Sequence, residues 1–124
     1  STLHWMLGEV DSGDIAFERS FTIPKNILAN DLYALAQTNA IKVFKDLIFF
    51  LNARIDIPRK KMKGFGNFYP RNTVQEKVGT EDDSLKMLAR RARAFYFSGF
   101  EPSFFIIDNK KYYIIPEVNK HENF

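Results

Sequence analysis

A long helical periodicity follows Pro24 and constrains the fold more than any other feature of the sequence. Asn30 or Asp31 offers an N-cap, and the pattern predicts a helix that continues to about Leu51 or Ala53. Its apolar side chains recur at steps of three and four residues, which is typical of a helix that packs on a sheet. This apolar stripe consists of Ile41, Phe44, Ile48 and Leu51. The chain must therefore supply a sheet against which the helix can be buried.

Two apolar segments before the helix are predicted to be strands of that sheet. Residues 2–7 carry large side chains and no turn residue, so we expect a strand with little exposure to solvent. In residues 15–23 apolar and polar side chains alternate, and Arg19 interrupts the apolar face. Turn residues at 11–14 separate the two segments. Two strands followed by a long helix indicate an α/β layer architecture.

Residues 56–79 contain proline and glycine at irregular intervals and show no periodicity, which predicts a loop. A loop of this length in a small chain is usually functional or disordered. It carries a cluster of basic residues followed by aromatic ones, namely Arg59, Lys60, Lys61, Lys63, Phe65, Phe68 and Tyr69. This set either holds a nucleotide diphosphate and stacks on its base, or forms a solvated basic loop.

Regular structure is predicted to resume at Thr80, which forms a capping box with Asp83 at the start of a second helix. The expected apolar side of this helix consists of Leu85, Leu88, Ala92 and Phe95, and the basic residues of its last turns are Arg90, Arg91 and Arg93. A hairpin is predicted next, with strands at residues 103–107 and 112–115 around a turn at 108–110. Beyond Pro116 the polar end is expected to fray.

Composition excludes several classes of site. With 45% hydrophobic residues and 13 Phe among 124 residues, the chain can build a core. A net charge of only +3 argues against a dedicated nucleic-acid binder. The lack of cysteine excludes disulfides and thiolate metal sites, and the distance between His4 and His121 argues against a histidine metal centre. No apolar run is long enough to span a membrane and no signal pattern opens the chain, so we expect a cytoplasmic protein.

Two runs of residues resemble segments of a known enzyme family. The first is His4-Trp5-Met6 with Glu9-Val10-Asp11-Ser12-Gly13-Asp14-Ile15-Ala16, which is similar to the segment where a late strand leads into an Asp-x-Gly-Asp loop. The second is Arg91-Ala92-Arg93-Ala94-Phe95-Tyr96-Phe97-Ser98-Gly99-Phe100-Glu101-Pro102. It is similar to the family's helix that ends in an Arg-Ala pair before a Pro/Gly turn and a strand pair. In both runs the chain resembles the folate-dependent formyltransferases, and the aromatic residues of this turn are closest to the sugar-nucleotide N-formyltransferases.

The resemblance implies the end of a doubly wound formyltransferase domain followed by a small C-terminal β-hairpin subdomain. The expected divisions are residues 1–55 for the end of the catalytic domain, 56–79 for the basic-aromatic loop and 80–124 for the C-terminal helix and hairpin. The implied reaction moves a formyl group from N10-formyltetrahydrofolate to the amine of a nucleotide-linked amino sugar, a step of lipopolysaccharide biosynthesis. The implied assembly is a homodimer formed through the C-terminal hairpin.

The resemblance also assigns roles to individual residues. Asp11 takes the position of the carboxylate that relays protons during formyl transfer, although an aspartate that begins an ordinary β-turn explains the same residue. The residues expected to border the folate are Glu9, Val10 and Gly13, with Asp14 shaping the loop. The residues expected to bind the acceptor are His4, Tyr69, Tyr96, Phe97 and Phe100. Core packing is the alternative for His4 and for at least one residue of the aromatic turn.

One element of the family is missing from its expected place. The family's Asn-x-His motif precedes the catalytic aspartate, whereas the one such triplet here, Asn119-Lys120-His121, follows Asp11 and is interpreted as chance. The parallel strands that precede the last helix of a doubly wound domain are also missing. We therefore expect activity in a longer parent protein and none in this chain by itself. The alternative function is a non-catalytic module that binds an anionic or nucleic-acid partner through the basic-aromatic loop.

Overall fold

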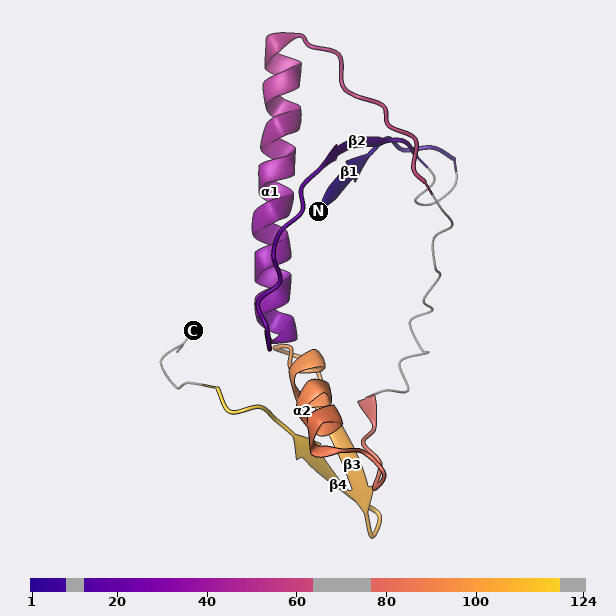
Figure 1. The fold of residues 1–124 in the computed structure, drawn as a ribbon, viewed down its shortest axis with the longest axis vertical. Coiled ribbons are helices and arrows are strands. Elements are labelled where there is room, and N and C mark those ends of the chain that lie inside the picture. Colours follow the sequence, from indigo (N-terminus) through magenta and orange to yellow (C-terminus); the bar gives the residue numbers. More distant parts are fainter. Residues whose placement is uncertain (9–12, 64–76, 119–124) are drawn as a thin grey trace. The chain divides into compact units, whose positions relative to one another are not determined.

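The computed structural model describes residues 1–8, 13–63 and 77–118. Its elements in chain order are β1 (Thr2–His4), β2 (Ile15–Glu18), α1 (Ala29–Ala53), α2 (Leu85–Ala94), β3 (Ser103–Ile107) and β4 (Lys110–Ile114), as Figure 1 shows. They form two compact units, of which one contains Ser1–Ile23 with Tyr33–Phe68 and the other Pro24–Leu32 with Tyr69–Phe124. No helix in the described ranges is long and apolar enough to cross a membrane.

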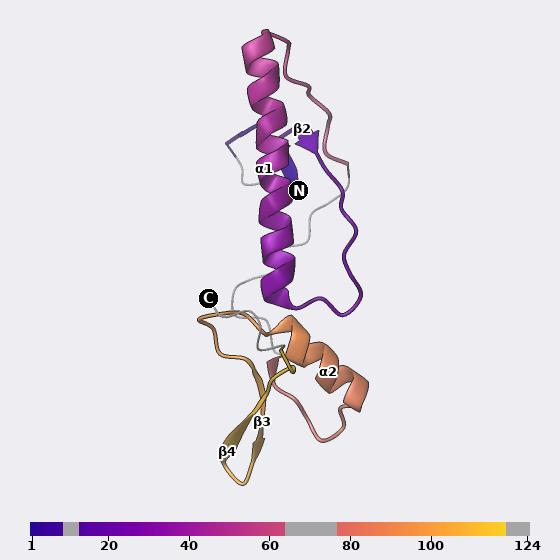
Figure 2. The same cartoon turned by 90° about the vertical axis from the view of Figure 1, so that its left-hand side faces the viewer.

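The first unit is a small antiparallel sheet against one side of α1 (Figures 1 and 2). β1 pairs with β2 through Leu3 opposite Phe17, and a bulge follows at His4. The Phe17 ring contacts the Phe50 ring edge to face, with 4.9 Å between their centroids. This aromatic contact attaches the sheet to the C-terminal half of the helix.

Both predicted strands are shorter than the sequence pattern indicates. β1 ends at His4, and the side chains of Met6 and Leu7 are 91% and 58% exposed, so the prediction of a little-exposed strand over residues 2–7 is wrong at its end. β2 ends at Glu18, and the next side chain, that of Arg19, donates two hydrogen bonds of 2.8 Å to the Asp46 carboxylate of α1. The charge that interrupted the apolar face therefore forms an ion pair with the helix.

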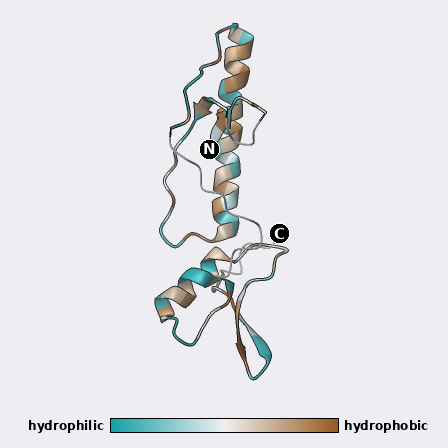
Figure 3. Cartoon of the chain, turned by 90° about the vertical axis from the view of Figure 1, so that its right-hand side faces the viewer, coloured by the Kyte–Doolittle hydropathy of each residue, from teal (hydrophilic) through white to brown (hydrophobic). Residues whose placement is uncertain are grey.

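The long helix is confirmed at Ala29–Ala53, but the face that it buries differs from the prediction. Its buried residues are Asn39 and Val43, and the Asn39 amide donates to the Leu35 carbonyl oxygen over 2.9 Å. The predicted stripe is exposed, with values of 57% at Ile41, 55% at Phe44, 40% at Ile48 and 53% at Leu51. At 100° per residue this stripe is centred roughly 120° around the helix from Val43. The helix thus has two apolar faces, and the two short strands cover only one of these faces. Figure 3 shows hydrophobic residues along α1.

In the second unit, α2 begins at Leu85 rather than at Thr80. Ser84 is its N-cap, and the Ser84 hydroxyl accepts a hydrogen bond from the Met87 backbone N–H. Asp83 closes the preceding turn, because its carboxylate accepts from the Thr80 N–H at 2.8 Å. The helix is one turn shorter than predicted, and Leu85 is 86% exposed instead of buried.

The C-terminal hairpin is confirmed, with β3 antiparallel to β4 and Ser103 opposite Ile114. Asp108 and Asn109 form its turn with φ values of 48° and 59°. Two consecutive positive φ angles are typical of a type I′ turn, whose twist matches that of the flanking strands. β4 therefore begins at Lys110, two residues earlier than the predicted second strand.

Candidate functional site

The predicted site residues divide into those that the structure describes and those that it does not. Asp11, Glu9, Val10 and Tyr69 lie outside the described residues, as does the Asn119-Lys120-His121 triplet. Their roles stay predictions. The structure places the remaining candidates, which are His4, Gly13, Tyr96, Phe97 and Phe100, and it describes both flanks of the segment that contains Asp11.

Gly13 lies against the backbone of Trp5, at the base of the predicted catalytic loop. A Cβ atom added to Gly13 would be 1.5 Å from the Trp5 carbonyl oxygen and 2.6 Å from its carbonyl carbon. Beside this contact the Trp5 N–H donates to the Asp14 carbonyl oxygen over 2.8 Å. Only glycine fits this approach of two backbones, and the reason is contact distance rather than an unusual φ angle. The base of the loop is thus closed by backbone groups.

The first residues of the basic segment contact Trp5, at the base of the same loop. The Trp5 indole N–H donates to the Pro58 carbonyl oxygen over 3.0 Å, and the Arg59 guanidinium lies 3.9 Å above the Trp5 ring. Lys60 forms two backbone hydrogen bonds with Ile15, of 2.8 Å and 3.0 Å. Lys60 therefore pairs with the first residue of β2, in a region that the sequence pattern predicted to be a loop.

Charge on this segment is partly neutralised. The Lys60 ammonium group donates to the Glu18 carboxylate over 2.8 Å, and this hydrogen bond lowers the pKa of Glu18. Both side chains are more than half exposed, so the pair contributes little to stability. Of the basic residues that the sequence grouped together, Lys60 is thus bound to the sheet. Arg59, Lys61 and Lys63 are exposed.

His4 is half-buried and lies opposite Ile15 at the bulge of the sheet. This position is one residue from Trp5, so it is near the loop base. Both interpretations of His4, as an acceptor-binding residue and as a sheet histidine, are compatible with its half-buried position.

The turn that carries the aromatic candidates, residues 97–100, lies in the second unit. The Phe100 N–H donates to the Phe97 carbonyl oxygen over 3.1 Å, and Gly99 has a φ of 78°. A positive φ at the third position is typical of a type II turn and favours glycine. The rings of Phe97 and Phe100 meet edge to face at 5.6 Å, while the Tyr96 carbonyl oxygen accepts from the Asn30 N–H.

The three aromatic candidates differ in their exposure to solvent. Phe100 is 73% exposed and available to a ligand, whereas Tyr96 and Phe97 are half-buried. Core packing therefore explains part of the burial of Tyr96 and Phe97. The turn places the Phe100 ring on the surface.

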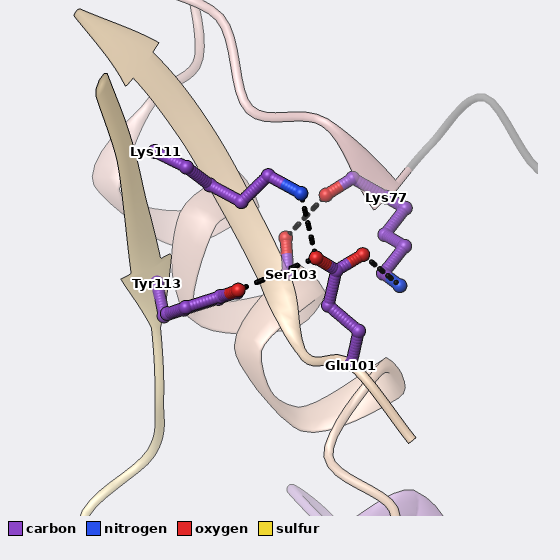
Figure 4. Close-up of polar contacts among 5 residues, drawn as sticks. All are labelled: Lys77, Glu101, Ser103, Lys111 and Tyr113. Carbon is purple, nitrogen blue, oxygen red and sulfur yellow. Dashed lines mark hydrogen bonds and ion pairs between the residues drawn. The ribbon is translucent and has the colours of Figure 1, made fainter.

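Glu101 organises an ion network that sequence reasoning missed (Figure 4). Its carboxylate accepts from Lys111 at 2.6 Å, from Lys77 at 2.9 Å and from the Tyr113 hydroxyl at 3.3 Å. The hydrogen bonds from Lys111 and Lys77 lower the pKa of Glu101 to about 2. Lys111 also lies 4.1 Å from the centre of the Phe104 ring. The alternation of Lys111 and Tyr113 on one face of β4 was a signal for this cluster, but its partner Lys77 is distant in sequence.

The network has a structural role in joining the hairpin to the preceding chain. The Ser103 hydroxyl, which is fully buried, donates to the Lys77 carbonyl oxygen over 2.7 Å. Val78 pairs in parallel with Phe104, and the Gly79 N–H donates to the Phe104 carbonyl oxygen. These contacts hold residues 77–79 beside β3. No group of side chains in the described ranges has the composition of a metal site.

Comparisons with known proteins identify the fold. No protein-family model matches the sequence, and no curated protein matches it. Among solved structures, the chain is similar to a 4-N formyltransferase from Francisella tularensis, with a TM-score of 0.82 and 22% sequence identity. The match covers 96% of this chain and 50% of that one, so the chain spans half the length of its structural neighbour. The described elements thus have a mixed α/β fold that matches part of a formyltransferase, in agreement with the expected C-terminal part.

Proposed function

We propose that this chain is part of an N-formyltransferase that moves a formyl group from N10-formyltetrahydrofolate to the amine of a nucleotide-linked amino sugar. The observation that carries the proposal is the fold similarity, which extends over 96% of the chain. The resemblance of the Asp-x-Gly-Asp loop is independent support, because it rests on residue types rather than on the backbone. Since the neighbour is a 4-N formyltransferase, an amine at the sugar 4-position is the preferred acceptor.

The exposed stripe of α1 supports a larger enzyme. Ile41, Phe44, Ile48 and Leu51 are each at least 40% exposed and follow one face of the helix. A continuous exposed apolar surface usually marks an interaction site rather than a solvent face. In the proposed enzyme this stripe packs against the part of the catalytic domain that corresponds to the other half of the neighbour.

In the proposed reaction the acceptor amine attacks the formyl carbon, and a tetrahedral oxyanion forms. The bond between that carbon and N10 then breaks, N10 takes a proton, and the amine loses one. Asp11 is the group proposed to accept the proton of the attacking amine. Gly13 contributes by allowing the loop base to close on Trp5, which fixes the entry and exit of the loop. The oxyanion donors of the proposed enzyme are the Asn and His of its upstream motif.

An assay of the full-length protein tests this function. N10-formyltetrahydrofolate is mixed with a panel of nucleotide-linked amino sugars, and formylated product is detected by mass spectrometry. Replacing Asp11 by Asn is expected to lower kcat by about 10²–10⁴-fold, the usual contribution of a positioned acid–base group. Asp56→Asn is the matched control, since Asp56 is an exposed carboxylate of the same unit.

Two results would contradict the proposal. Near-normal turnover in the Asp11→Asn variant would remove the catalytic assignment. Failure of the full-length wild type to formylate any amino sugar, together with strongly salt-dependent binding to single-stranded nucleic acid, would support the non-catalytic binding module instead.

A further inference from the structure

One residue, Trp5, anchors the chain that enters the loop containing Asp11. The residues that follow Trp5 lie at the surface: Met6 and Leu7 are 91% and 58% exposed, and no atom lies within 4 Å of a Cβ added to Gly8. Trp5 is half-buried by contrast. The position of the entering chain therefore depends on what Trp5 contacts.

Trp5 connects the loop base to residues 58 and 59. On one side its backbone N–H donates to the Asp14 carbonyl oxygen over 2.8 Å. On the other side its indole N–H donates to the Pro58 carbonyl oxygen over 3.0 Å. The Arg59 guanidinium lies over the indole ring, 3.9 Å from its centre. The ring is thus held at its edge by Pro58 and on its face by Arg59.

The same segment also holds the chain that leaves the loop. Lys60 forms two backbone hydrogen bonds with Ile15, of 2.8 Å and 3.0 Å, and Ile15 is the first residue of β2. Residues 58–60 therefore contact both the entering and the leaving chain, and we refer to them as the loop clamp. All of these residues belong to the first unit, so both ends of the loop are attached to one support.

We infer that the loop clamp positions Asp11 for the proposed formyl transfer, with Trp5 and Arg59 as positioning residues that act through the loop base. The inference rests on the proposed function, which assigns the proton transfer to Asp11. A loose clamp allows the ends of the loop to shift, and a misplacement of about 1 Å caused far from the chemistry can lower a rate about 10²-fold. Because the contacts of the clamp are made within the chain, we expect it to affect kcat rather than the KM for the acceptor.

Hydrogen exchange at Trp5 tests the clamp without any assay of catalysis. Trp5 is the only tryptophan of the chain, so isotope-labelled tryptophan gives one backbone N–H signal and one indole N–H signal in an NMR spectrum. The Arg59→Gln variant removes the guanidinium from the ring. Both signals are then expected to exchange about 2- to 5-fold faster, which is the cation–π contribution at an exposed site expressed as a rate. Lys42→Gln is the matched control, because it removes one positive charge from an exposed lysine of α1 and should leave both exchange rates unchanged.

Formyl transfer by the full-length protein tests the effect on the reaction. Replacing Trp5 by benzothienylalanine, in which a sulfur atom takes the place of the indole N–H, removes the hydrogen bond to Pro58 and keeps the shape of the ring. We expect kcat to fall by about 10- to 10²-fold and the KM for the acceptor to stay close to that of the wild type. Arg59→Gln should lower kcat in the same way, and Arg59→Lys should restore part of it, because an ammonium group also binds the face of an indole. Urea midpoints of the same proteins show whether each variant is folded in the assay.

Each of three results would overturn the inference. The first is unchanged hydrogen exchange at both Trp5 signals in Arg59→Gln, and the second is a wild-type kcat in the benzothienylalanine variant. The third is a rise in the KM for the acceptor at constant kcat in Arg59→Gln, which would assign Arg59 to a substrate site instead. A wild type that formylates no amino sugar contradicts the proposed function, whereas the exchange experiment still decides whether the clamp holds the loop base.

Discussion

Replacing Gly13 by Ala tests the geometry at the base of the predicted catalytic loop. The added Cβ would be 1.5 Å from the Trp5 carbonyl oxygen, whereas real Cβ atoms are essentially never closer than 3.0 Å to a neighbour. The two backbones must therefore separate by at least about 1.5 Å, the difference between these distances. Both contacting atoms belong to backbone, so no side-chain rotation relieves the clash.

The cost has two parts. Forced displacement in a well-packed region costs about 1–3 kcal/mol. A separation of this size also stretches the hydrogen bond from the Trp5 N–H to Asp14, now 2.8 Å, beyond the bonding range, which costs about 0.5–1.5 kcal/mol. The expected loss is about 2–4 kcal/mol of unfolding free energy. Domains of this size have about 5–15 kcal/mol, so the variant should still fold.

Urea denaturation followed by tryptophan fluorescence measures this loss where it occurs, because Trp5 is the single tryptophan of the chain. With a slope of about 2 kcal/mol per molar urea, the middle of the usual range, the midpoint should fall by about 1–2 M. Gly8→Ala is the matched control: no atom lies within 4 Å of its added Cβ, so its midpoint should stay constant or rise slightly. If Gly13→Ala unfolds within about 0.5 kcal/mol of Gly8→Ala, the close approach described above is refuted.

Three further predictions concern the second unit. Glu101→Gln should destabilise the hairpin at neutral pH, and the difference from wild type should vanish as pH falls. The sign follows from the pKa: it is lowered from 4.5 to about 2 in the folded state, so the stabilisation is complete above 4.5 and is lost between 4.5 and about 2. Urea midpoints at several pH values check this, and a difference independent of pH would contradict it. Ser84→Ala should cost about 1 kcal/mol by removing the N-cap of α2, whereas Ser84→Asp should cost little, as thermal unfolding can show. Gly99→Ala should cost about 1–2 kcal/mol from its φ of 78° alone, because its Cβ position is open; an unchanged melting temperature would contradict the strained angle.

Local signals in the sequence predicted the elements better than their contacts. The helix at Ala29–Ala53 and the hairpin were predictable because periodicity and turn residues act over a few positions. The buried face of α1 was not predictable in the same way. Its apolar residues cover two sides, and the stripe with the better period, through Phe44 and Ile48, is the exposed one. Periodicity identifies an apolar face but does not tell which neighbour covers it.

The capping signal at Thr80 illustrates a second limit. Thr80 and Asp83 form one bond of a capping box, from the Thr80 N–H to the Asp83 carboxylate, but the Asp83 N–H donates to the Thr80 main-chain carbonyl oxygen, as in a β-turn. They close a turn rather than a helix start, because Ser84 follows with its own N-cap geometry. The Asp83 carboxylate also forms an ion pair with the guanidinium group of Arg91 in α2, at 3.2 Å. The local motif thus predicted one hydrogen bond correctly and the start of the helix wrongly.

The candidate site depends on contacts between segments that are far apart in the sequence. Trp5, Gly13 and Arg59 meet at the loop base, yet no local pattern links the first strand to a segment that follows α1.

The same arrangement allows effects on the proposed function to be distinguished from effects on stability. The base is closed by Trp5, Gly13 and Asp14 through backbone groups, so Gly13→Ala should lower both stability and formyl transfer. Asp11→Asn should lower transfer alone, because it exchanges one polar side chain for another of nearly the same size. A loss of activity in the Asp11 variant without a change in the urea midpoint would therefore assign the effect to chemistry rather than to the fold.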